Sequence, residues 1–424
     1  MEFFSDISLS DLFFGFAFLF PLLMAWLWMA GGIWFYFKRE FRQTVFPEPS
    51  QESCSIIIPC FNEEEQIRET IKFAMQSQYP DFEVIAINDG STDKTAEILD
   101  ELALHYPKLR VVHLAENQGK AYALRAGAMV SQHEFLICID GDALLHPHAV
   151  FWMMNHLTHY PRVGAVTGNP RIINRSSVLG KIQVGEFSSI IGLIKRAQRT
   201  YGRIFTVSGV IAGFRKTALD RIGYWRDDMI TEDIDVSWRL QFDHWDLQYV
   251  PKALCYIYMP ETFKGLWQQR LRWAQGGIEV LFAYVPKLFK WRLRRMWPVV
   301  FEAIISVIWV YVMTAIILLY VIGLFIELPE QWAVTTVLPN WYGIVLGTTC
   351  LIQFLVSLMI DRQYDNSRTL RTYFWVIWYP LFFWVLMTIT TAIALPKTIF
   401  KKPKRARWVS PDRGFREGQD HVKL

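Results

Sequence analysis

The chain has 424 residues, of which 52% are hydrophobic and 16% aromatic, and it carries a formal net charge of +4 at pH 7. This length suits a full catalytic domain together with membrane-spanning segments. The small charge is concentrated near the ends of hydrophobic runs, which argues against nucleic-acid binding. The five cysteines are odd in number, lack metal-ligand spacing and lie mostly in apolar runs, as expected for free thiols in a reducing compartment.

Four hydrophobic runs are long enough to cross a bilayer, since a span needs about 20 apolar residues. They cover residues 12–37, 303–326, 341–360 and 373–395. The first lacks the basic start and the small-residue cleavage site of a signal peptide, so we expect an N-terminal membrane anchor over residues 1–37. Basic residues follow this run, whereas the segment before it has only acidic ones. The positive-inside rule therefore predicts an outer N-terminus and a cytoplasmic region over residues 38–300.

The same rule conflicts with the C-terminal end of the chain. Three further crossings would place the tail, residues 401–424, outside the cytoplasm, yet its first residues are rich in lysine and arginine. A re-entrant segment, a stretch at residues 277–297 that dips into the membrane, or an exception to the rule would each resolve the conflict. The sequence leaves these alternatives open.

Residues 53–145 alternate between short apolar runs and amphipathic segments. We expect strands at residues 55–58, 82–87, 110–114 and 135–139, and helices after a cap at Asn62, at residues 92–105 and at residues 120–130. Alternation with short connections predicts an α/β fold, a mostly parallel sheet covered by helices on both faces. In such sheets ligands bind beyond the carboxyl ends of the strands.

The pattern after Pro147 is less regular. We expect helices at residues 148–159, 179–199, 232–242 and 265–276, a strand at residues 163–167 and an apolar turn at residues 207–214. The last of these helices is amphipathic and leads toward the membrane through a basic, tryptophan-rich stretch.

Asp140 and Asp142 follow the predicted strand at residues 135–139, and because they are two residues apart both side chains can point the same way. Paired carboxylates at a strand end can hold a hard divalent ion that keeps open positions for phosphate oxygens. Such an ion would stabilise a departing diphosphate. The alternative is a common Asp-Gly turn after a buried strand.

Asp89 follows the predicted strand at residues 82–87, and Gly90 gives the turn after it conformational freedom. A carboxylate at this point can accept hydrogen bonds from a nucleobase or a ribose. We therefore predict a ligand contact for Asp89 rather than a capping turn alone. Asp93, in contrast, is expected only to cap the following helix.

Asp233 lies at the start of the predicted helix at residues 232–242, beside Glu232. A carboxylate here could be the general base that takes a proton from an acceptor hydroxyl. Direct displacement assisted by such a base inverts the anomeric carbon, so an α-linked nucleotide sugar would give a β-linkage. The alternative is that both residues only complement the helix dipole, which is the interpretation we favour for Glu232.

Gln269, Arg272 and Trp273 share one helix face because they are spaced i, i+3 and i+4. Arg272 can pair with a diphosphate, and the Trp273 indole can stack on an acceptor sugar. Trp267 and Arg270 lie off that face, and we expect them to sit among lipid headgroups. An interfacial helix without substrate contacts is the alternative for the whole segment.

Taken together, these clusters resemble the processive family-2 glycosyltransferases, which include cellulose, chitin and hyaluronan synthases. The resemblance rests on residues 55–63, 88–93, 117–121, 140–142, 231–233 and 269–273, and it extends from about residue 35 to the C-terminus. Within the family, the chain is similar to the branch that polymerises N-acetylglucosamine through β-1,6 linkages. That narrower similarity rests on residues 168–171, 180–186 and 407–414.

The resemblance implies a nucleotide-sugar-binding (Rossmann-like) domain of the GT-A type, UDP-N-acetylglucosamine as donor and a divalent ion, Mg²⁺ or Mn²⁺. The family positions that bind the nucleotide, the diphosphate or the acceptor correspond to Asp89, Lys120, Asp140, Gln269, Arg272 and Trp273. The family positions for catalysis correspond to Asp233 and Asp142, and those for the metal to Asp140 and Asp142. Ser208-Gly209 matches the turn that lines the acceptor pocket.

The expected organisation has five parts. They are a membrane anchor at residues 1–37, a cytoplasmic GT-A domain at 38–262, interfacial helices at 263–297, transmembrane helices at 298–400 and a basic tail at 401–424. The product would be a biofilm polysaccharide that the membrane helices guide across the bacterial inner membrane. The family also implies a small membrane-protein subunit and, in Gram-negative members, activation by cyclic di-GMP, although the chain has no RxxxR pattern followed by D/NxSxxG.

Two other functions remain alternatives. The first is transfer of a single sugar to a lipid carrier, and the second is a membrane channel or assembly protein that binds sugar without chemistry. The cluster at residues 269–273 is not needed for a single transfer, so it favours a polymerase. The complete set of carboxylate clusters argues against a protein without catalysis.

Overall fold

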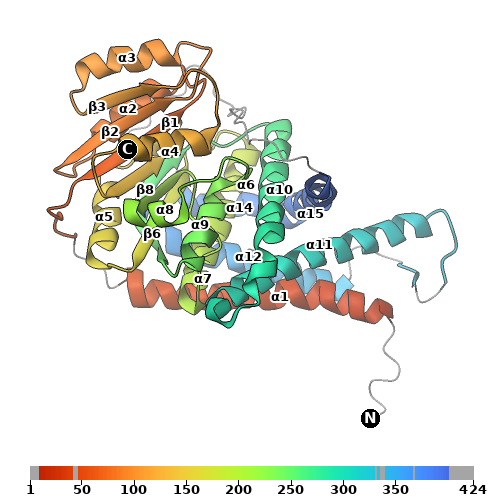
Figure 1. Ribbon diagram of the computed structural model, residues 1–424. Helices are drawn as coiled ribbons and strands as arrows, with labels where there is room; N and C mark the ends of the chain where they lie inside the picture. Colours follow the sequence, from red (N-terminus) through yellow and green to blue (C-terminus); the bar gives the residue numbers. More distant parts are fainter. Residues whose placement is uncertain (1–8, 42–45, 330–331, 335–339, 366–367, 401–424) are drawn as a thin grey trace.

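The structure is a computed structural model that describes residues 9–41, 46–329, 332–334, 340–365 and 368–400 (Figure 1). A mixed sheet with helices on its two faces forms the larger body, and long apolar helices extend away from it. The predicted basic tail, residues 401–424, lies outside the described residues, and so do residues 407–414 of the family resemblance.

The sheet has eight strands in the order β3-β2-β1-β4-β7-β6-β8-β5. They are β1 (Cys54–Cys60), β2 (Phe82–Asn88), β3 (Leu109–His113), β4 (Phe135–Ile139), β5 (Leu144–Leu145), β6 (Val163–Ile172), β7 (Ile211–Arg215) and β8 (Asp246–Ile257). The four predicted strands of the first half, β3-β2-β1-β4, are parallel to one another. The carboxyl ends of these strands therefore meet along one edge, as expected.

The second half of the sheet departs from the expected parallel order. β7 runs antiparallel to both β4 and β6, and β5 runs antiparallel to β8. The apolar turn predicted at residues 207–214 is wrong from residue 211 onward, because Ile211, Ala212 and Phe214 are buried in a central strand. β8 lies where the pattern predicts no element.

Six helices pack around the sheet. They are α2 (Ile67–Met75), α3 (Thr95–His105), α4 (Lys120–Val130), α5 (Ala149–His159), α8 (Lys216–Ile222) and α9 (Glu232–Phe242). The helix predicted to be capped by Asn62 is wrong at its start, because Asn62 has a φ of 54° and accepts a hydrogen bond from the Thr92 N–H at 2.9 Å. The expected cap at Asp93 is only partly right, because the N-cap residue of α3 is Lys94, although Asp93 Oδ1 does accept the N–H of Thr95, the first residue of the helix, at 3.0 Å.

The helix predicted at residues 179–199 is one uninterrupted helical run. It consists of α6 (Val178–Glu186), a π-helical stretch η3 (Phe187–Leu193) and α7 (Ile194–Tyr201). The helix predicted at residues 265–276 is longer than expected, since α10 spans Phe263–Leu288 without a break. A short η4 (Trp291–Met296) follows it.

Four helices in the described part of the chain are long and apolar enough to cross a membrane. They are α1 (Leu9–Phe35), α11 (Trp297–Gly323), α12 (Asn340–Asp361) and α15 (Tyr379–Ile399). The run predicted at residues 373–395 is divided, because the short α13 (Arg368–Arg371) and α14 (Tyr373–Val376) precede α15. α1 packs along α7 and α12, and α10 packs against α15 (Figure 1).

A buried ion network joins the α/β domain to two of these helices. Arg196 on α7 lies 2.5 Å from Glu40, which follows α1 in η2 (Tyr36–Glu40), and 3.0 Å from Asp361 at the end of α12. Arg171 on β6 lies 2.6 Å from the other oxygen of Asp361. Because an unpaired buried charge is strongly unfavourable, this network fixes the sheet, α7 and the two apolar helices relative to one another.

Candidate active site

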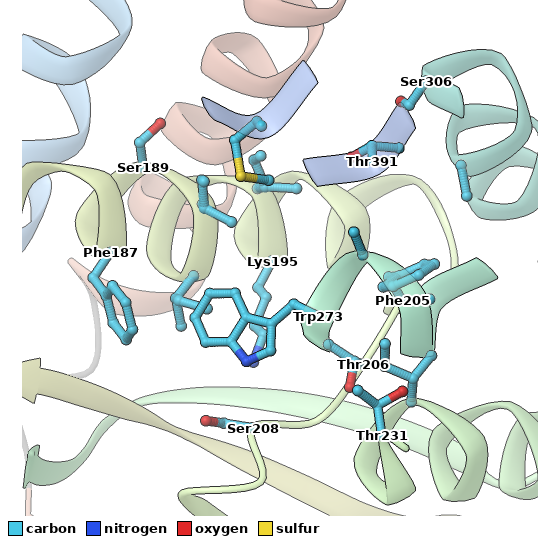
Figure 2. Close-up of a pocket in the computed structure, with 18 of the residues that line it drawn as sticks. Phe187, Ser189, Lys195, Phe205, Thr206, Ser208, Thr231, Trp273, Ser306 and Thr391 are labelled. Atoms are coloured by element: carbon cyan, nitrogen blue, oxygen red, sulfur yellow. The ribbon is translucent and has the colours of Figure 1, made fainter. Parts of the chain in front are cut away.

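One cavity of about 990 Å³ contains all three predicted metal and base aspartates, Asp140, Asp142 and Asp233. Side chains of the α/β domain line one part of it, and side chains of α1, α11, α12 and α15 line another. Figure 2 shows the middle of the cavity, with Ser208 and Thr231 on one side and Ser306 and Thr391 on the other. The aspartates that are far apart in sequence thus share a single space next to the apolar helices.

Lys120 connects the carboxylates on the domain side of the cavity. It is the first residue of α4, and its Nζ lies 2.6 Å from Asp140 Oδ1 and 3.0 Å from Glu232 Oε1. The same ammonium group donates a hydrogen bond to the Gly209 carbonyl at 3.2 Å. Glu232, which was predicted only to complement the helix dipole, therefore also neutralises a buried lysine.

The charges of this cluster are set by burial and by one another. Burial disfavours the charge of Lys120, but Asp140 and Glu232 hold its pKa above the ordinary value. Burial raises the pKa of Asp140, and Lys120 opposes that shift. Burial also disfavours the charge of Glu232, but the positive charge of Lys120 outweighs this effect. The pKa of Glu232 is therefore lowered.

Asp140 and Asp142 come directly after β4, and both face the cavity. Their oxygens are the hard ligands that Mg²⁺ and Mn²⁺ prefer. Among the described residues, no cluster of three or more His, Cys, Asp and Glu side chains could enclose an ion. An ion on the two aspartates would therefore keep open positions toward the cavity, so this pair fits a metal shared with a phosphate ligand.

Asp233 is held in the first turn of α9 by backbone donors. Its Oδ1 accepts the Ile234 N–H at 2.9 Å, and its Oδ2 accepts the Gly209 N–H at 3.2 Å. Burial, reinforced by Glu232 and opposed by Lys120, raises the pKa of Asp233 to about 6. A carboxylate with this pKa is ionised at neutral pH and is more basic than an ordinary aspartate, as a general base requires.

Gly209 has little room for a side chain. A Cβ atom there would lie 3.2 Å from both Asp233 Oδ2 and Lys120 Nζ. The Ser208-Gly209 turn, predicted from the family resemblance to line an acceptor pocket, does line this cavity.

Gln269, Arg272 and Trp273 all line the cavity from α10, so the helical face predicted from their spacing is confirmed. Gln269 Oε1 is buried and has no hydrogen-bond partner among the described residues. The Trp273 indole packs against the main hydrophobic core and extends into the cavity in Figure 2.

The prediction that Trp267 and Arg270 sit among lipid headgroups is wrong. Arg270 is 1% exposed and pairs with Glu186 of α6 at 2.5 Å, and its guanidinium lies 4.4 Å from the centre of the Trp273 ring. Trp267 is half-buried in a hydrophobic cluster with α12 and α15. Both side chains contact protein because α6, α12 and α15 cover this side of α10.

Asp89 does not line the cavity. It is buried, and its two oxygens accept the N–H groups of Gln118 and Gly119, each at 2.8 Å. Burial raises the pKa of Asp89, although these two hydrogen bonds oppose the shift. The carboxylate thus orders the loop that leads into Lys120, and its contact with a nucleotide stays a prediction.

Sequence reasoning missed two ionisable residues of the cavity. Lys195 lies on α7 and is 4% exposed, and Glu302 lies on α11 and accepts hydrogen bonds from Trp28 and Tyr201, each at 3.2 Å. The signal for Glu302 was a lone carboxylate beside an apolar run. Lys195 gave a weaker signal, since it lies beside Arg196 in the predicted helix at residues 179–199 and nothing local marks it as buried.

Comparisons with known proteins agree with this geometry. Residues 55–223 match the model of the protein family Glycosyl transferase family 2. The chain is 39% identical over 407 residues to a poly-beta-1,6-N-acetyl-D-glucosamine synthase of Staphylococcus epidermidis, covering 95% of this chain and 98% of the relative. The chain belongs to glycosyltransferase family 2.

A further poly-beta-1,6-N-acetyl-D-glucosamine synthase to which the chain is similar comes from Staphylococcus aureus strain COL. It is 39% identical over 412 residues, covering 95% of this chain and 98% of the relative. The chain is also similar to a solved structure, the mannosyltransferase PcManGT from Pyrobaculum calidifontis in complex with GDP-Man and Mn²⁺. The match covers 92% of this chain and 98% of the PcManGT chain. It has a TM-score of 0.60 at 18% identity, which is a likeness of fold. The predicted GT-A fold and hexosyltransferase class are confirmed for this family-2 glycosyltransferase.

Proposed function

We propose that this family-2 glycosyltransferase polymerises N-acetylglucosamine from UDP-N-acetylglucosamine into a β-1,6-linked biofilm exopolysaccharide. One observation carries the proposal: a single cavity joins Asp140, Asp142 and Asp233 to four helices that could span a membrane. An enzyme with this arrangement can add sugars at one end of the cavity and release the growing chain into the other. The names of the Staphylococcus relatives support the choice of sugar and linkage.

In the proposed reaction Asp233 takes the proton from the acceptor hydroxyl. The hydroxyl oxygen then forms a bond to the anomeric carbon of the donor, while the bond from that carbon to the diphosphate oxygen breaks and UDP leaves. Because the attack comes from the side opposite the diphosphate, an α-linked donor gives a β-linkage. The raised pKa of Asp233, about 6, suits this proton transfer.

The donor would lie on the Asp140 side of the cavity. Asp140 and Asp142 would hold a divalent ion, Mg²⁺ or Mn²⁺, which when bound neutralises charge on the leaving diphosphate. Lys120 and Arg272 supply further positive charge from two other elements, α4 and α10. We assign Gln269 to the same substrate, because it lines the cavity and its buried carbonyl oxygen has no hydrogen-bond partner among the described residues.

The polymer would leave through the part of the cavity between the apolar helices. Aromatic rings there can stack on sugar faces, and hydroxyl and amide groups can replace water around sugar hydroxyls. These side chains are Trp28, Ser306, Trp309, Thr349, Gln353, Trp384, Thr388 and Thr391. We therefore propose that synthesis at the cytoplasmic face of the bacterial inner membrane is coupled to translocation through these helices. The small membrane-protein subunit and activation by cyclic di-GMP that the family implies belong to the same proposal.

The test uses the purified full chain in detergent or lipid nanodiscs, supplied with one radiolabelled UDP-sugar at a time. Only UDP-N-acetylglucosamine should give a long product, and linkage analysis should find β-1,6 bonds. Asp233→Asn should lower polymer formation at least a thousand-fold, whereas Asp220→Asn on the exposed surface of α8 should leave it unchanged. Normal polymerisation by Asp233→Asn would contradict the assignment of the base.

Product size separates this function from its alternatives. A transferase that adds one sugar to a lipid carrier gives a small lipid-linked product. A protein that only binds sugar releases no UDP. A ladder of long chains together with stoichiometric UDP release is expected only from a polymerase.

A further inference from the structure

Lys195 is a buried cation in the cavity that the proposed reaction does not use. It extends from α7 and is 4% exposed, and its Nζ donates one hydrogen bond, to Thr167 Oγ1 at 3.3 Å. Among the described residues it has no carboxylate within ion-pair distance, unlike Arg196, the next residue along the helix. A buried lysine without a counter-ion is unfavourable for folding unless a partner satisfies it, so Lys195 is a candidate for a ligand contact.

Lys120 and Lys195, the two lysines that line the cavity, differ in how many acceptors surround their N–H donors. An ammonium group has three N–H donors. Lys120 Nζ lies within 3.2 Å of three acceptors, since it pairs with Asp140 at 2.6 Å and Glu232 at 3.0 Å and donates a hydrogen bond to the Gly209 carbonyl at 3.2 Å. Among the described residues Lys195 donates a hydrogen bond only to the Thr167 hydroxyl, which also accepts the Ser208 N–H at 2.8 Å. Lys195 therefore has donors left over in a cavity that a ligand must fill.

These unused donors lie between the base and the predicted stacking residue. Thr167 binds the backbone of Ser208, and the next residue, Gly209, donates its N–H to Asp233. Figure 2 shows Lys195 extending from its helix into the space where Trp273 and Ser208 lie. Burial lowers the pKa of Lys195 to about 7, while the charge of Asp233 opposes the shift. The side chain carries N–H donors in either protonation state.

We propose that Lys195 binds the acceptor, donating hydrogen bonds to hydroxyl or acetamido oxygens of the terminal sugar of the growing chain. The contact would hold that sugar against Trp273 with its reacting hydroxyl at Asp233. The inference rests on the proposed function, because it takes the acceptor to be a polymer end. It assigns Lys195 to the acceptor and not to the nucleotide, whose binding groups lie around Lys120.

The experiment compares Lys195→Met with Lys195→Gln in the purified full chain. Methionine keeps the length of the side chain and removes every donor, whereas glutamine restores N–H donors on a neutral group. The assay measures transfer from UDP-N-acetylglucosamine to soluble β-1,6-linked N-acetylglucosamine oligosaccharides, and separately the release of UDP to water without an acceptor. Lys181→Met is the matched control, because Lys181 lies on the same helical run over the Trp375 ring and does not line the cavity.

For Lys195→Met we expect the KM for the oligosaccharide to rise about ten-fold or more, in line with the loss of a hydrogen bond from a charged group. The KM for the donor and acceptor-free UDP release should stay within about two-fold of wild type. Lys195→Gln should recover part of the acceptor affinity. The melting temperature of Lys195→Met should be equal to or above that of wild type, because a buried charge is removed.

Three results would overturn the assignment. They are an acceptor KM within two-fold of wild type, a donor KM that rises as much as the acceptor KM, or a marked loss of thermal stability in both Lys195 variants but not in Lys181→Met. Failure of the proposed function would look different, since the wild-type protein itself would then make no polymer from UDP-N-acetylglucosamine. If another sugar were the donor, the same two KM values measured with that sugar would still test Lys195.

Discussion

Arg270 on α10 and Glu186 on α6 form a buried ion pair, with 2.5 Å between Nη2 and Oε2. The guanidinium group lies 4.4 Å from the centre of the Trp273 ring, and the Tyr379 hydroxyl of α15 lies 3.4 Å from the other oxygen of Glu186. The pair thus connects α10 to α6 and, through Tyr379, to the apolar helix α15. These contacts lie next to Trp273, the residue proposed to stack on the acceptor. Its two members are 84 residues apart in sequence.

Glu186→Gln should destabilise the protein, because it leaves the Arg270 charge buried without a counter-ion. Breaking a buried pair in this way costs about 3–5 kcal/mol. Thermal unfolding of the purified protein in detergent should show a clear fall in melting temperature. Glu101→Gln is the control, since Glu101 pairs with Arg68 on the exposed surface, where both side chains are 51% exposed. Equal melting temperatures for the two variants would contradict a structural role for the Glu186 pair.

The pH dependence of turnover should report the protonation of Asp233. Burial raises the pKa of this carboxyl to about 6, and only the ionised form can accept a proton. The rate at saturating substrate should therefore fall as the pH drops through about 6 and level off above it. Steady-state UDP release measured between pH 5 and pH 8 checks this expectation.

Glu232→Gln should shift the fall in rate at acidic pH to a lower pH. Glu232 is a neighbouring negative charge that raises the pKa of Asp233, so its removal makes Asp233 easier to ionise. Glu97→Gln, at an exposed position on α3, should leave the profile unchanged. If the rate fell at the same pH in Glu232→Gln as in wild type, a group other than Asp233 would control the rate.

The sequence predicted the features that depend on local spacing. Asp140 and Asp142 could be placed at a strand end because β4 is a continuous apolar run, and Gln269, Arg272 and Trp273 could be placed on one face because helical periodicity fixes it. Their convergence in one cavity is not local, because Asp140 and Asp142 reach it from a strand end and Gln269, Arg272 and Trp273 reach it from α10. The residue types of the clusters then pointed to the family.

What the sequence could not predict depends on contacts between distant segments. Arg270 looked interfacial because its partner, Glu186, lies in another helix. The strand β7 looked like an apolar turn because four consecutive buried residues between two antiparallel neighbours carry no alternating pattern. Lys195 was not singled out because nothing local indicates that α1 packs against α7.

Removal of divalent ions should abolish sugar transfer. Without a cation between them, the carboxylates of Asp140 and Asp142 would repel the leaving diphosphate, so treatment with EDTA should stop UDP release, and added Mg²⁺ or Mn²⁺ should restore it. Asp142→Asn should raise the metal concentration needed for half-maximal rate by about ten-fold or more, since one anionic ligand is lost. Asp220→Asn, on the exposed surface of α8, should leave that concentration unchanged. Full activity in EDTA would exclude the metal assignment.

Gly276→Ala should disturb the base through the contact between α10 and the start of α9. A Cβ atom at Gly276 would lie 2.3 Å from Thr231 Oγ1 and Cγ2, so one of the two helices must shift. Overpacking of this kind costs about 1–3 kcal/mol. Thr231 is two residues before Asp233, so we expect both a lower melting temperature and at least a ten-fold lower rate of UDP release.

Gly277→Ala provides the matched control, because a Cβ atom at Gly277 would meet nothing within 4 Å. Both glycines lie inside α10, so both substitutions gain the same intrinsic helix stability of about 1 kcal/mol. The difference between their melting temperatures therefore isolates the contact with Thr231. Gly277→Ala should be as stable as wild type or more so, with Gly276→Ala clearly below it. If the two variants unfolded at the same temperature, α10 would not contact the start of α9 as closely as the structure shows. The position of Asp233 would then not depend on α10.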